Sequence, residues 1–552
     1  MKTRRPTFLI FFCVGLLLCL TTFKMVGQQH LRFRNPLGTN LSAVADWSTE
    51  MPFVDAFKTS RTWLTQCVNT DPDCDDPWNT KEYNKLNLDP QGWVKSLPPP
   101  DAKEVYTRVG TLLFNGMENY PKGTYIVLYE GEGTIEYGFD AVKNPRASKP
   151  GRDVLQVTPS SQGIYLIVTK TDPRKTGKYL RNIRVIPQQY EASYKTKIFN
   201  PKFLEKISPF QTLRFMDWMK TNNSPQQHWQ DRPLPNKASY TDSLGVPLEV
   251  LIKLANQLNV NPWFNIPHQA DDEYVNKFAQ LVKKTLKPNL TIYLEYSNEV
   301  WNPQFQQFSW VRDKGFVKNQ NSPYQSYGIR TAQICQVWKQ VFDQRKDRVQ
   351  CVMATQTANP WVAEQVLKCP DWQQSPCYKH GIDLLAITGY FSGELGKPKN
   401  ADIVRGWLSD VHNNPFDLAI KQLNNGEIFP TKDSVEDTIK YFRNYTKVAT
   451  EYGLKLVVYE GGSHVVGVQG IENDPELTEF FIDLHRQTGF YYLYQKLLQG
   501  WQDNSGQRTL FMHYGDISRP SKWGSWGALE HLEQESSPRY QALLDFIQGK
   551  NE

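Results

Sequence analysis

The sequence predicts an α/β protein: a (β/α)₈ TIM barrel that carries an inserted antiparallel β-sandwich. Two textures along the chain predict this fold. After residue 194, short apolar strands alternate with amphipathic helical segments, which is typical of a parallel sheet covered by helices. Between residues 103 and 187, closely spaced strands are separated by Gly and Pro turns, without a helical period of useful length. An open doubly wound sheet is disfavoured because the chain lacks a glycine-rich nucleotide-binding turn.

Eight apolar segments are the expected strands of the barrel. The first is "GTNLSAV" at 38–44, and the other seven lie at 212–218, 261–267, 290–299, 349–357, 382–390, 454–462 and 509–516. Eight strand–helix units fit a closed barrel better than an open sheet. Asn40 opens a glycosylation sequon, but we expect no glycan on it because it falls on the first barrel strand.

Helical periodicity supports the segments between these strands. One helical face carries the apolar residues Leu251, Leu254, Ala255 and Leu258. Asp271 or Asp272 is a candidate N-cap for the next helix, whose apolar positions include Val275, Phe278, Val282 and Leu286. We therefore expect helices of ordinary amphipathic character around the barrel.

The chain divides into four expected segments. Residues 1–27 form an N-terminal targeting segment, 28–102 the start of the barrel and a linker, 103–190 the inserted sandwich, and 191–552 the rest of the barrel. The linker is rich in Asp, Asn and Pro between residues 71 and 100. The sandwich could be a carbohydrate-binding module, a wall of the substrate cleft or an oligomer contact. The sequence leaves these alternatives and the oligomeric state open.

The N-terminus predicts export. Lys2, Arg4 and Arg5 precede an apolar run at 8–23 that Lys24 ends. The run lies between the length of a signal-peptide core and that of a membrane-spanning helix. We expect a secreted or otherwise extracytoplasmic protein, either cleaved from this segment or anchored to the membrane by it.

Cysteine usage agrees with an exported chain. Cys13 and Cys19 lie in the targeting segment, and the other six can pair by proximity as Cys67–Cys74, Cys335–Cys351 and Cys369–Cys377. An even count in an exported protein favours disulfides, although the sequence alone does not determine the connectivity. A zinc site is the rival interpretation, but neither a CxxC pair nor matching His spacing supports it.

Composition and charge limit the kinds of molecule that the protein is expected to bind. The net charge of +6 is spread along the chain without a Lys/Arg run, so we expect no nucleic-acid partner. The 16 tryptophans fit an aromatic core and sugar-stacking surfaces equally well. The spacing of His, Asp and Glu does not suggest a catalytic metal site, and we expect no cofactor.

Polar residues cluster where the predicted strands end. In a (β/α)₈ barrel the carboxyl ends of the strands form the active site, so residues at these ends are candidates for chemistry. The candidates are Arg214, Asp217, Asn265, His268, Asn298, Glu299, Tyr390, Glu460, His513 and Asp516.

Two of these motifs carry a family resemblance. "LEYSNEVWN", which contains Glu299, followed by "VVYEGG", which contains Glu460, resembles the signature of the clan A retaining glycoside hydrolases. The resemblance covers 38–44 and the chain from about residue 210 onward, but not the insertion. It implies a (β/α)₈ fold, with Glu299 as acid/base after strand four and Glu460 as nucleophile after strand seven.

The same resemblance implies supporting roles. Arg214 matches an arginine that keeps the nucleophile ionised, and Tyr390 matches a tyrosine that bonds to it. His268 fits a substrate-binding histidine, and Trp523 or Trp526 fits the tryptophan that floors the sugar site. Asn298 could donate to a sugar hydroxyl, and Trp301 is a further candidate for substrate contact.

The chemistry of glycoside cleavage needs these residue types. One carboxylic acid protonates the leaving oxygen, and a carboxylate about 5–5.5 Å away attacks the anomeric carbon in retaining enzymes. We therefore expect a retaining hydrolase of polysaccharide or oligosaccharide, with the β preference taken from the resemblance. A non-catalytic carbohydrate-binding surface protein and a transglycosylase are the alternatives. Serine-hydrolase chemistry is disfavoured because the chain lacks a GxSxG motif.

Overall fold

The computed structural model describes residues 35–68, 72–99, 101–317, 323–506 and 509–550. The expected targeting segment at 1–27, with Cys13 and Cys19, lies outside these residues. Within the described ranges, no helix is both long enough and apolar enough to cross a membrane.

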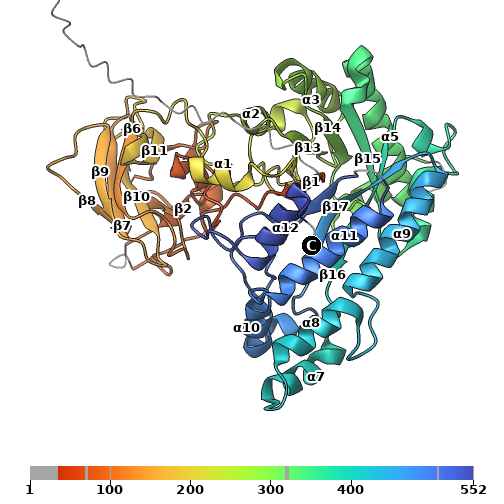
Figure 1. The fold of residues 1–552 in the computed structure, drawn as a ribbon. Helices are drawn as coiled ribbons and strands as arrows, with labels where there is room; N and C mark the ends of the chain where they lie inside the picture. The colour runs from red at the N-terminus through yellow and green to blue at the C-terminus, as the bar shows by residue number, and fades with distance from the viewer. Residues whose placement is uncertain (1–34, 69–71, 100, 318–322, 507–508, 551–552) are drawn as a thin grey trace, which may run out of the picture. The chain divides into compact units, whose positions relative to one another are not determined.

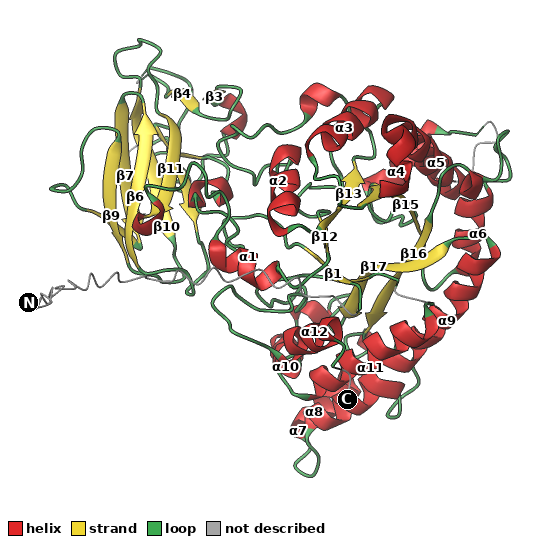
Figure 2. Ribbon diagram, turned by 45° about the horizontal axis from the view of Figure 1, so that its top comes forward, coloured by secondary structure: helices red, strands yellow, loops and turns green. Residues whose placement is uncertain are grey.

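Eight parallel strands close into a barrel, as predicted (Figures 1 and 2). Each strand pairs in parallel with the next, and the last pairs with the first. In order they are β1 (Leu37–Asn40), β12 (Thr212–Arg214), β13 (Asn261–Ile266), β14 (Ile292–Tyr296), β15 (Val349–Ala354), β16 (Leu384–Phe391), β17 (Lys455–Ser463) and β18 (Phe511–His513). Every predicted strand segment therefore overlaps one observed strand, although β1, β12 and β18 are shorter than expected.

Helices surround this barrel (Figure 2). They are α1 (Pro201–Ile207), α2 (Leu248–Leu258), α3 (Asp272–Thr285), α4 (Gln306–Lys314), α5 (Pro323–Phe342), α6 (Pro360–Lys368), α7 (Pro398–Ser409), α8 (Pro415–Asn425), α9 (Val435–Glu451), α10 (Pro475–Leu484), α11 (Gly489–Asn504) and α12 (Pro538–Gln548). Of the two candidate caps, Asp271 is the N-cap of α3, and its carboxylate accepts from the backbone N–H of Tyr274. The apolar face of α3 is buried at Val275, Phe278 and Val282, as its periodicity predicts.

The inside of the barrel is packed with side chains. One hydrophobic cluster gathers buried residues from several of its strands: Trp263, Val352, Ala354, Leu384, Ala386, Val457, Tyr459, Leu510 and Met512. A filled interior leaves the strand ends as the place where a substrate can meet polar groups.

Two four-stranded antiparallel sheets lie between β1 and β12 in the chain (Figure 1). The first contains β2 (Leu64–Gln66), β5 (Arg108–Leu113), β10 (Ile164–Thr171) and β7 (Gly133–Phe139). The second contains β11 (Arg181–Pro187), β6 (Gly123–Glu130), β9 (Arg152–Val157) and β8 (Ala141–Lys143). β2 lies in the segment expected to be a linker, where β3 (Asn87–Leu88) and β4 (Val94–Ser96) also pair.

Buried residues of the two sheets belong to one hydrophobic cluster. Val109 and Leu166 come from the first sheet, and Val127 and Leu155 from the second. The same cluster continues into the residues that cover the barrel, and the insertion and barrel fall in one compact unit. Both sheets therefore contribute side chains to one apolar cluster that also includes residues around the barrel.

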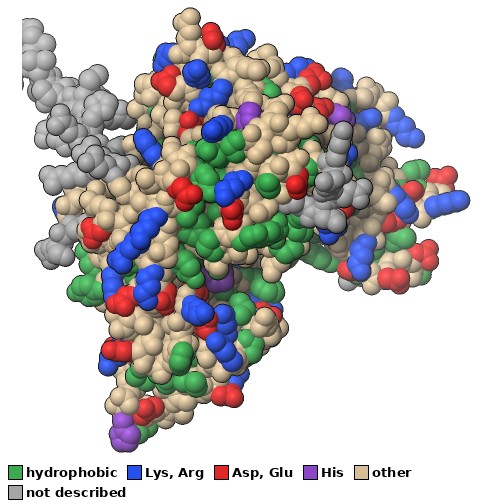
Figure 3. Space-filling view, turned by 90° about the vertical axis from the view of Figure 1, so that its right-hand side faces the viewer, with side chains coloured by type: hydrophobic (Ala, Val, Ile, Leu, Met, Phe, Trp, Pro, Cys, Tyr) green, Lys and Arg blue, Asp and Glu red, His purple; other side chains and the backbone are tan. Residues whose placement is uncertain are grey.

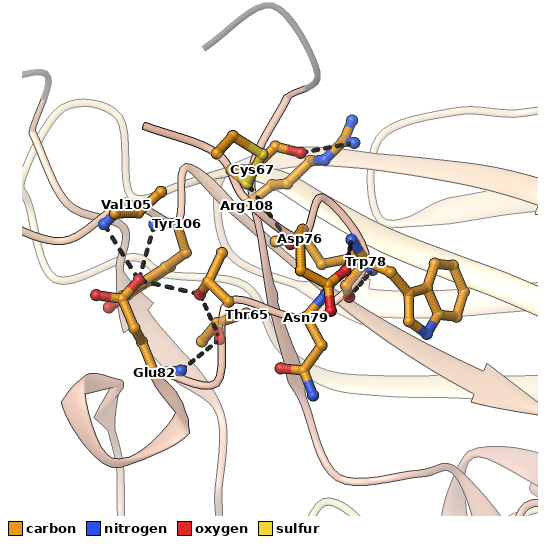
Figure 4. Close-up of a disulfide and its surroundings, with 12 residues drawn as sticks. Thr65, Cys67, Asp76, Trp78, Asn79, Glu82, Val105, Tyr106 and Arg108 are labelled. Carbon is orange, nitrogen blue, oxygen red and sulfur yellow. Dashed lines mark hydrogen bonds between the residues drawn. A yellow bond between two sulfur atoms is a disulfide. The ribbon is translucent and has the colours of Figure 1, made fainter. Parts of the chain in front are cut away.

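A disulfide and a pair of hydrogen bonds fix the chain around Cys67 and Glu82, ahead of β5 (Figure 4). Cys67 and Cys74 form a disulfide just after β2. Glu82 Oε2 accepts from the backbone N–H groups of Val105 and Tyr106, each at 3.1 Å, just before β5 begins. The hydrogen bonds of Glu82 therefore connect the described part of the expected linker to the start of β5.

The three disulfides follow the pairing by proximity. Besides the disulfide after β2, Cys335 of α5 is bonded to Cys351 of β15, and Cys369 to Cys377. All six cysteines of the described residues are thus paired, and the zinc interpretation of these cysteines is wrong.

On the face drawn in Figure 3, acidic and basic side chains are interspersed.

Candidate active site

Arg214, the last residue of β12, is the centre of a buried polar network. Its side chain is fully excluded from solvent. Nη1 donates to Glu460 Oε1 at 2.6 Å and to Asn40 Oδ1 at 2.9 Å, and Nη2 donates to Asn298 Oδ1 at 2.8 Å. Burial favours the neutral guanidine, but Glu295 and Glu460 outweigh it and raise the pKa of Arg214 above its ordinary value. One cation therefore connects residues from four barrel strands or their ends.

Glu295 is a member of this network that the sequence reasoning missed. It lies in the middle of β14, is fully buried, and accepts from Arg214 Nε at 3.0 Å and Nη2 at 2.8 Å. Trp263 Nε1 and Asn265 Nδ2 of β13 each donate to it at 2.8 Å. A glutamate within the apolar run "IYLEY" was the signal, because an unpaired charge there would be costly.

Glu460 is brought into the site by an irregularity of β17. Pairing with β16 runs Ile387 to Val458 and then Thr388 to Glu460, so Tyr459 is an extra residue. Such a bulge re-aims the side chains that follow it. The Glu460 carboxylate accepts from Arg214 through Oε1 and from the hydroxyl of Tyr390 through Oε2, the latter at 3.0 Å.

Glu299 follows β14 in a strained backbone. Both Ser297 (φ 56°) and Glu299 (φ 42°) adopt left-handed conformations, which cost non-glycine residues about 1–3 kcal/mol each and cluster at functional sites. The carboxylate of Glu299 accepts from Tyr459 Oη and Asn302 Nδ2, each at 2.9 Å. These two hydrogen bonds hold the Glu299 carboxylate in place after the strained turn.

The protonation of Glu299 differs from that of an ordinary glutamate. Burial, with the nearby negative charge of Glu460, raises the pKa of Glu299 to about 7. The bonds from Asn302 and Tyr459 oppose this shift without cancelling it. Around neutral pH, a large fraction of Glu299 therefore carries a proton that it can donate.

Asn298 is fixed on both sides of its amide. Its Oδ1 accepts from Arg214, and its Nδ2 donates to Asn222 Oδ1 at 3.1 Å. Gln307 of α4 donates to the same Asn222 oxygen at 2.7 Å and to the Asn298 carbonyl at 2.8 Å. The loop that carries the Asn–Glu pair is thus held by hydrogen bonds to the segment after β12.

Aromatic residues form a wall beside Glu460. Trp526 lies 6.1 Å from Tyr390, 5.4 Å from Tyr514 and 5.1 Å from His464, measured between ring centroids. Trp526 is half-buried, and its Nε1 donates to the carbonyl of Trp523 at 2.9 Å. Of the two tryptophans considered as a floor, Trp526 therefore contacts the carboxylate network through Tyr390, whereas Trp523 is 64% exposed.

Two other residues predicted to contact substrate, His268 and Trp301, lie buried beside the site. His268 is buried, lies 5.9 Å from the ring of Trp310, and has an Nδ1 without a partner among the described residues. Burial lowers its pKa to about 4, so it is neutral at physiological pH. Trp301 is also buried, and its Nε1 has no partner in the described ranges.

Asp217 supplies a third carboxylate near the pair. Burial and the charge of Glu460 raise the pKa of Asp217 to about 6. The charge of Asp217, followed by burial, raises the pKa of Tyr514 well above its ordinary value. The strand-end residues His513 and Asp516 bond to protein groups instead: His513 Nε2 lies 3.1 Å from Tyr494 Oη, and Asp516 Oδ1 accepts from Ser42.

The chemical capacity of this site is acid–base and nucleophilic. Among the described residues, no group of three or more His, Cys, Asp or Glu side chains is arranged to hold a metal ion. The arrangement offers one carboxylate with an arginine and a tyrosine on it, and one carboxylic acid that is protonated near neutral pH.

The similarity of this chain to known proteins is low in sequence. No protein-family model matches the sequence, and no curated protein matches it. Among solved structures, the chain is similar to a GH5-4 broad specificity endoglucanase from Bacteroides salanitronis, with 10% identity, a TM-score of 0.36, and coverage of 64% of this chain and 85% of that chain. It is also similar to a family 5 xyloglucanase from Paenibacillus pabuli, with 10% identity, a TM-score of 0.36, and coverage of 65% and 93% respectively. The closed eight-stranded parallel barrel of this chain is consistent with the clan A glycoside hydrolase resemblance of its sequence.

Proposed function

We propose that the protein is an exported retaining glycoside hydrolase that cleaves β-linked polysaccharide or oligosaccharide. Glu299 is the acid/base and Glu460 the nucleophile in this proposal. The observation that carries it is the asymmetry of the two carboxylates. Arg214 and Tyr390 both donate to Glu460, whereas burial and the charge of Glu460 raise the pKa of Glu299 to about 7.

In the first step, Glu299 gives its proton to the glycosidic oxygen as the bond from that oxygen to the anomeric carbon breaks. Glu460 attacks the anomeric carbon and forms a covalent glycosyl ester. Arg214 and Tyr390 hold the attacking carboxylate in position, so little rearrangement is needed when its charge is consumed. The Asn298 amide, fixed by Arg214 and Asn222, is positioned to meet a substrate hydroxyl.

In the second step, Glu299 is the base. It removes a proton from water, the water oxygen attacks the anomeric carbon, and Glu460 leaves as a carboxylate with the original configuration restored. A pKa near 7 suits both duties because the group must gain and lose a proton in each turnover.

Substrate contacts and location are further parts of the proposal. We assign sugar contact to Trp526 and Asn298, together with Trp301, His268 and Trp523. Three disulfides suit an oxidising compartment, which supports export by the N-terminal segment.

Hydrolysis of a panel of polysaccharides and aryl glycosides tests the function. Wild-type protein is compared with Glu299→Gln, Glu460→Gln and, as a matched control, Glu451→Gln at the exposed end of α9. We expect the first two variants to lose most activity and the control to retain it. Wild-type protein that binds a polymer but hydrolyses none would favour the non-catalytic carbohydrate-binding protein, and longer products with an acceptor sugar would indicate a transglycosylase.

A further inference from the structure

A cavity of about 560 Å³ lies away from the carboxylate pair. Its lining comes from β6 and β11 of the insertion, Gly151, the segments after β1 and after β11, the segment between β12 and α2, and the start of α2. Arg214, Glu299, Tyr390 and Glu460 are not among its lining residues. Its volume lies within the range of roughly 300–1,000 Å³ that small-molecule sites occupy.

The walls of this cavity are largely aromatic and aliphatic. Tyr129, Tyr194 and Tyr240 line it, together with Phe53, Ile198 and Val250. Tyrosine rings offer flat apolar faces with a polar edge, a surface on which the C–H face of a pyranose can pack. The cavity therefore has the apolar part of a sugar site.

Arg184 of β11 lines the cavity, and only one of its guanidinium nitrogens donates to another described residue. Its Nη1 donates to Asp55 Oδ2 at 2.8 Å, and its guanidinium carbon lies 5.8 Å from the ring centroid of Tyr194. The other oxygen of Asp55 accepts from the backbone N–H groups of Phe57 and Val185. No partner is recorded for Nε and Nη2 of Arg184 within the described ranges, which leaves donors for a ligand.

Lys58 adds a second cation. Its Nζ donates to the carbonyl of Lys237 and lies 4.6 Å from the ring centroid of Tyr240. In the part of the chain that the structure describes, Lys58 forms no ion pair with a carboxylate within 4.0 Å. Burial lowers its pKa to about 8, with Arg184 adding to the shift and Asp55 opposing it. The charge of Asp55 thus influences both cations, but its carboxylate is ion-paired only with Arg184.

The rim does not supply the missing negative charge. Glu130 lines the cavity but lies 3.4 Å from Arg181, and the exposed Lys195 adds another cation. A ligand that brings its own carboxylate would complete the charges and could occupy the free side of the Arg184 fork.

We propose that this cavity, lined by Arg184, Lys58 and Tyr194, is a second carbohydrate site that binds a carboxylate-bearing sugar, a hexuronate unit of an acidic saccharide. The choice of a sugar over another organic acid rests on the proposed glycosidase function. The carboxylate bonds to Arg184 beside Lys58, and the pyranose ring packs against the tyrosines. The protein then holds an acidic polysaccharide at a point away from the carboxylate pair.

Isothermal titration calorimetry of the whole protein with a galacturonic acid trisaccharide tests this site. The matched ligand is the same trisaccharide with its carboxyl groups reduced to alcohols. The variants are Arg184→Met, Arg184→Lys and, as a control, Lys122→Met at an exposed position before β6. Thermal unfolding of each variant checks that it remains folded.

We expect the acidic trisaccharide to bind and Arg184→Met to weaken it about tenfold or more, because a charge-assisted hydrogen bond is lost. Arg184→Lys should weaken it less, and Lys122→Met should leave it unchanged. The proposal is overturned if the acidic trisaccharide does not bind, if the reduced one binds equally well, or if Arg184→Met has no effect. Acetate or phosphate binding at Arg184 as tightly as the trisaccharide would equally overturn a sugar site. The hydrolysis panel reports on Glu299 and Glu460 independently, so the two proposals can fail separately.

Discussion

Arg214 donates to Glu460 over 2.6 Å while the same guanidinium holds the fully buried Glu295 through Nε and Nη2. The cation therefore has two carboxylates to satisfy, one structural and one exposed to the site. Because neither the arginine nor Glu295 touches solvent, water cannot replace any bond that is removed. The position of the Glu460 carboxylate consequently depends on an arginine that Glu295 also holds.

Replacing Arg214 with lysine should damage both activity and stability. A single ammonium cannot reproduce the contacts to Glu295, Glu460 and Asn298. We expect at least about a 100-fold loss of kcat, in line with removal of an electrostatic contact in an active site. Breaking a buried ion pair should also lower the free energy of unfolding by about 3–5 kcal/mol. Steady-state kinetics and urea unfolding measure the two effects, with Arg146→Lys at an exposed position as the control. Wild-type activity in the Arg214 variant would contradict this assignment.

Activity should fall as the pH rises through about 7. Glu299 must be protonated to act as the acid, and its pKa in the free protein is about 7, so the alkaline limb of kcat/KM reports this group. Asn302→Ala removes a donor that favours the ionised carboxylate. The pKa of Glu299 should rise, and the alkaline limb should move to higher pH. Asn425→Ala, at the exposed end of α8, should leave the profile in place. A limb that moves to lower pH in Asn302→Ala would exclude Glu299 as its origin.

Much of the barrel could be predicted from the sequence because its strands are short apolar runs between helical periods. The strand ends then follow, and with them the grouping of Arg214, Asn298, Tyr390 and the two glutamates. Closeness in the sequence was enough to predict the disulfide pairing, because each disulfide closes a short loop, such as that between Cys369 and Cys377. The first strand of the inserted sheets, β2, is harder to predict, because its three residues are too few to show an alternation of apolar and polar side chains.

The rest of the site depends on three-dimensional detail that a strand pattern does not contain. Perfect alternation in β17 would place Tyr459 and Glu460 on opposite faces, but the bulge brings both to the barrel mouth, where Tyr459 bonds to Glu299. Glu295 lies inside a strand instead of at its end, so a search of strand ends passes over it. Asn40 was noted only for its sequon, yet its side chain is buried against Arg214.

Glu299→Gln should make the protein more stable at neutral pH than at acidic pH, relative to wild type. The folded pKa of Glu299 is about 7 and its ordinary value is 4.5, so the folded protein binds this proton more tightly than the unfolded chain. The contribution of Glu299 to stability is therefore full below pH 4.5 and is lost as the pH rises through about 7. Glutamine does not titrate. Urea unfolding at pH 4.5 and 7.5 should show the variant gaining up to about 3 kcal/mol over wild type across this interval. Equal differences at the two pH values would refute the raised pKa.

Trp526→Ala should weaken substrate binding more than Trp523→Ala. Trp526 packs against Tyr390 and Tyr514, whereas Trp523 is 64% exposed. Loss of one aromatic packing surface should raise KM roughly 3–10-fold, with a smaller effect on kcat. KM on the best substrate of the panel measures the difference between the two variants. A larger effect from Trp523 would identify that residue as the floor of the sugar site.

Glu50 and Asp516 should share one proton behind the barrel mouth. Glu50 Oε2 accepts from Trp218 Nε1, and Asp516 Oδ1 accepts from Ser42, but the remaining oxygen of each carboxyl is buried without a donor among the described residues. Burial raises the pKa of both groups, and the charge of Asp516 raises that of Glu50 further. A proton held between the two free oxygens satisfies both.

Raised folded pKa values mean that this pair stabilises the protein at acidic pH and loses that contribution as the pH rises. Glu50→Gln places a permanent N–H donor beside Asp516 and removes one titrating group. As the pH rises from acidic to alkaline, we expect this variant to keep its Tm better than wild type does, as measured by calorimetry. Glu50→Ala, which leaves Asp516 without the donor, should instead lower Tm across the whole range. If wild type and Glu50→Gln lose Tm in parallel as the pH rises, the shared proton is wrong and another group causes the loss.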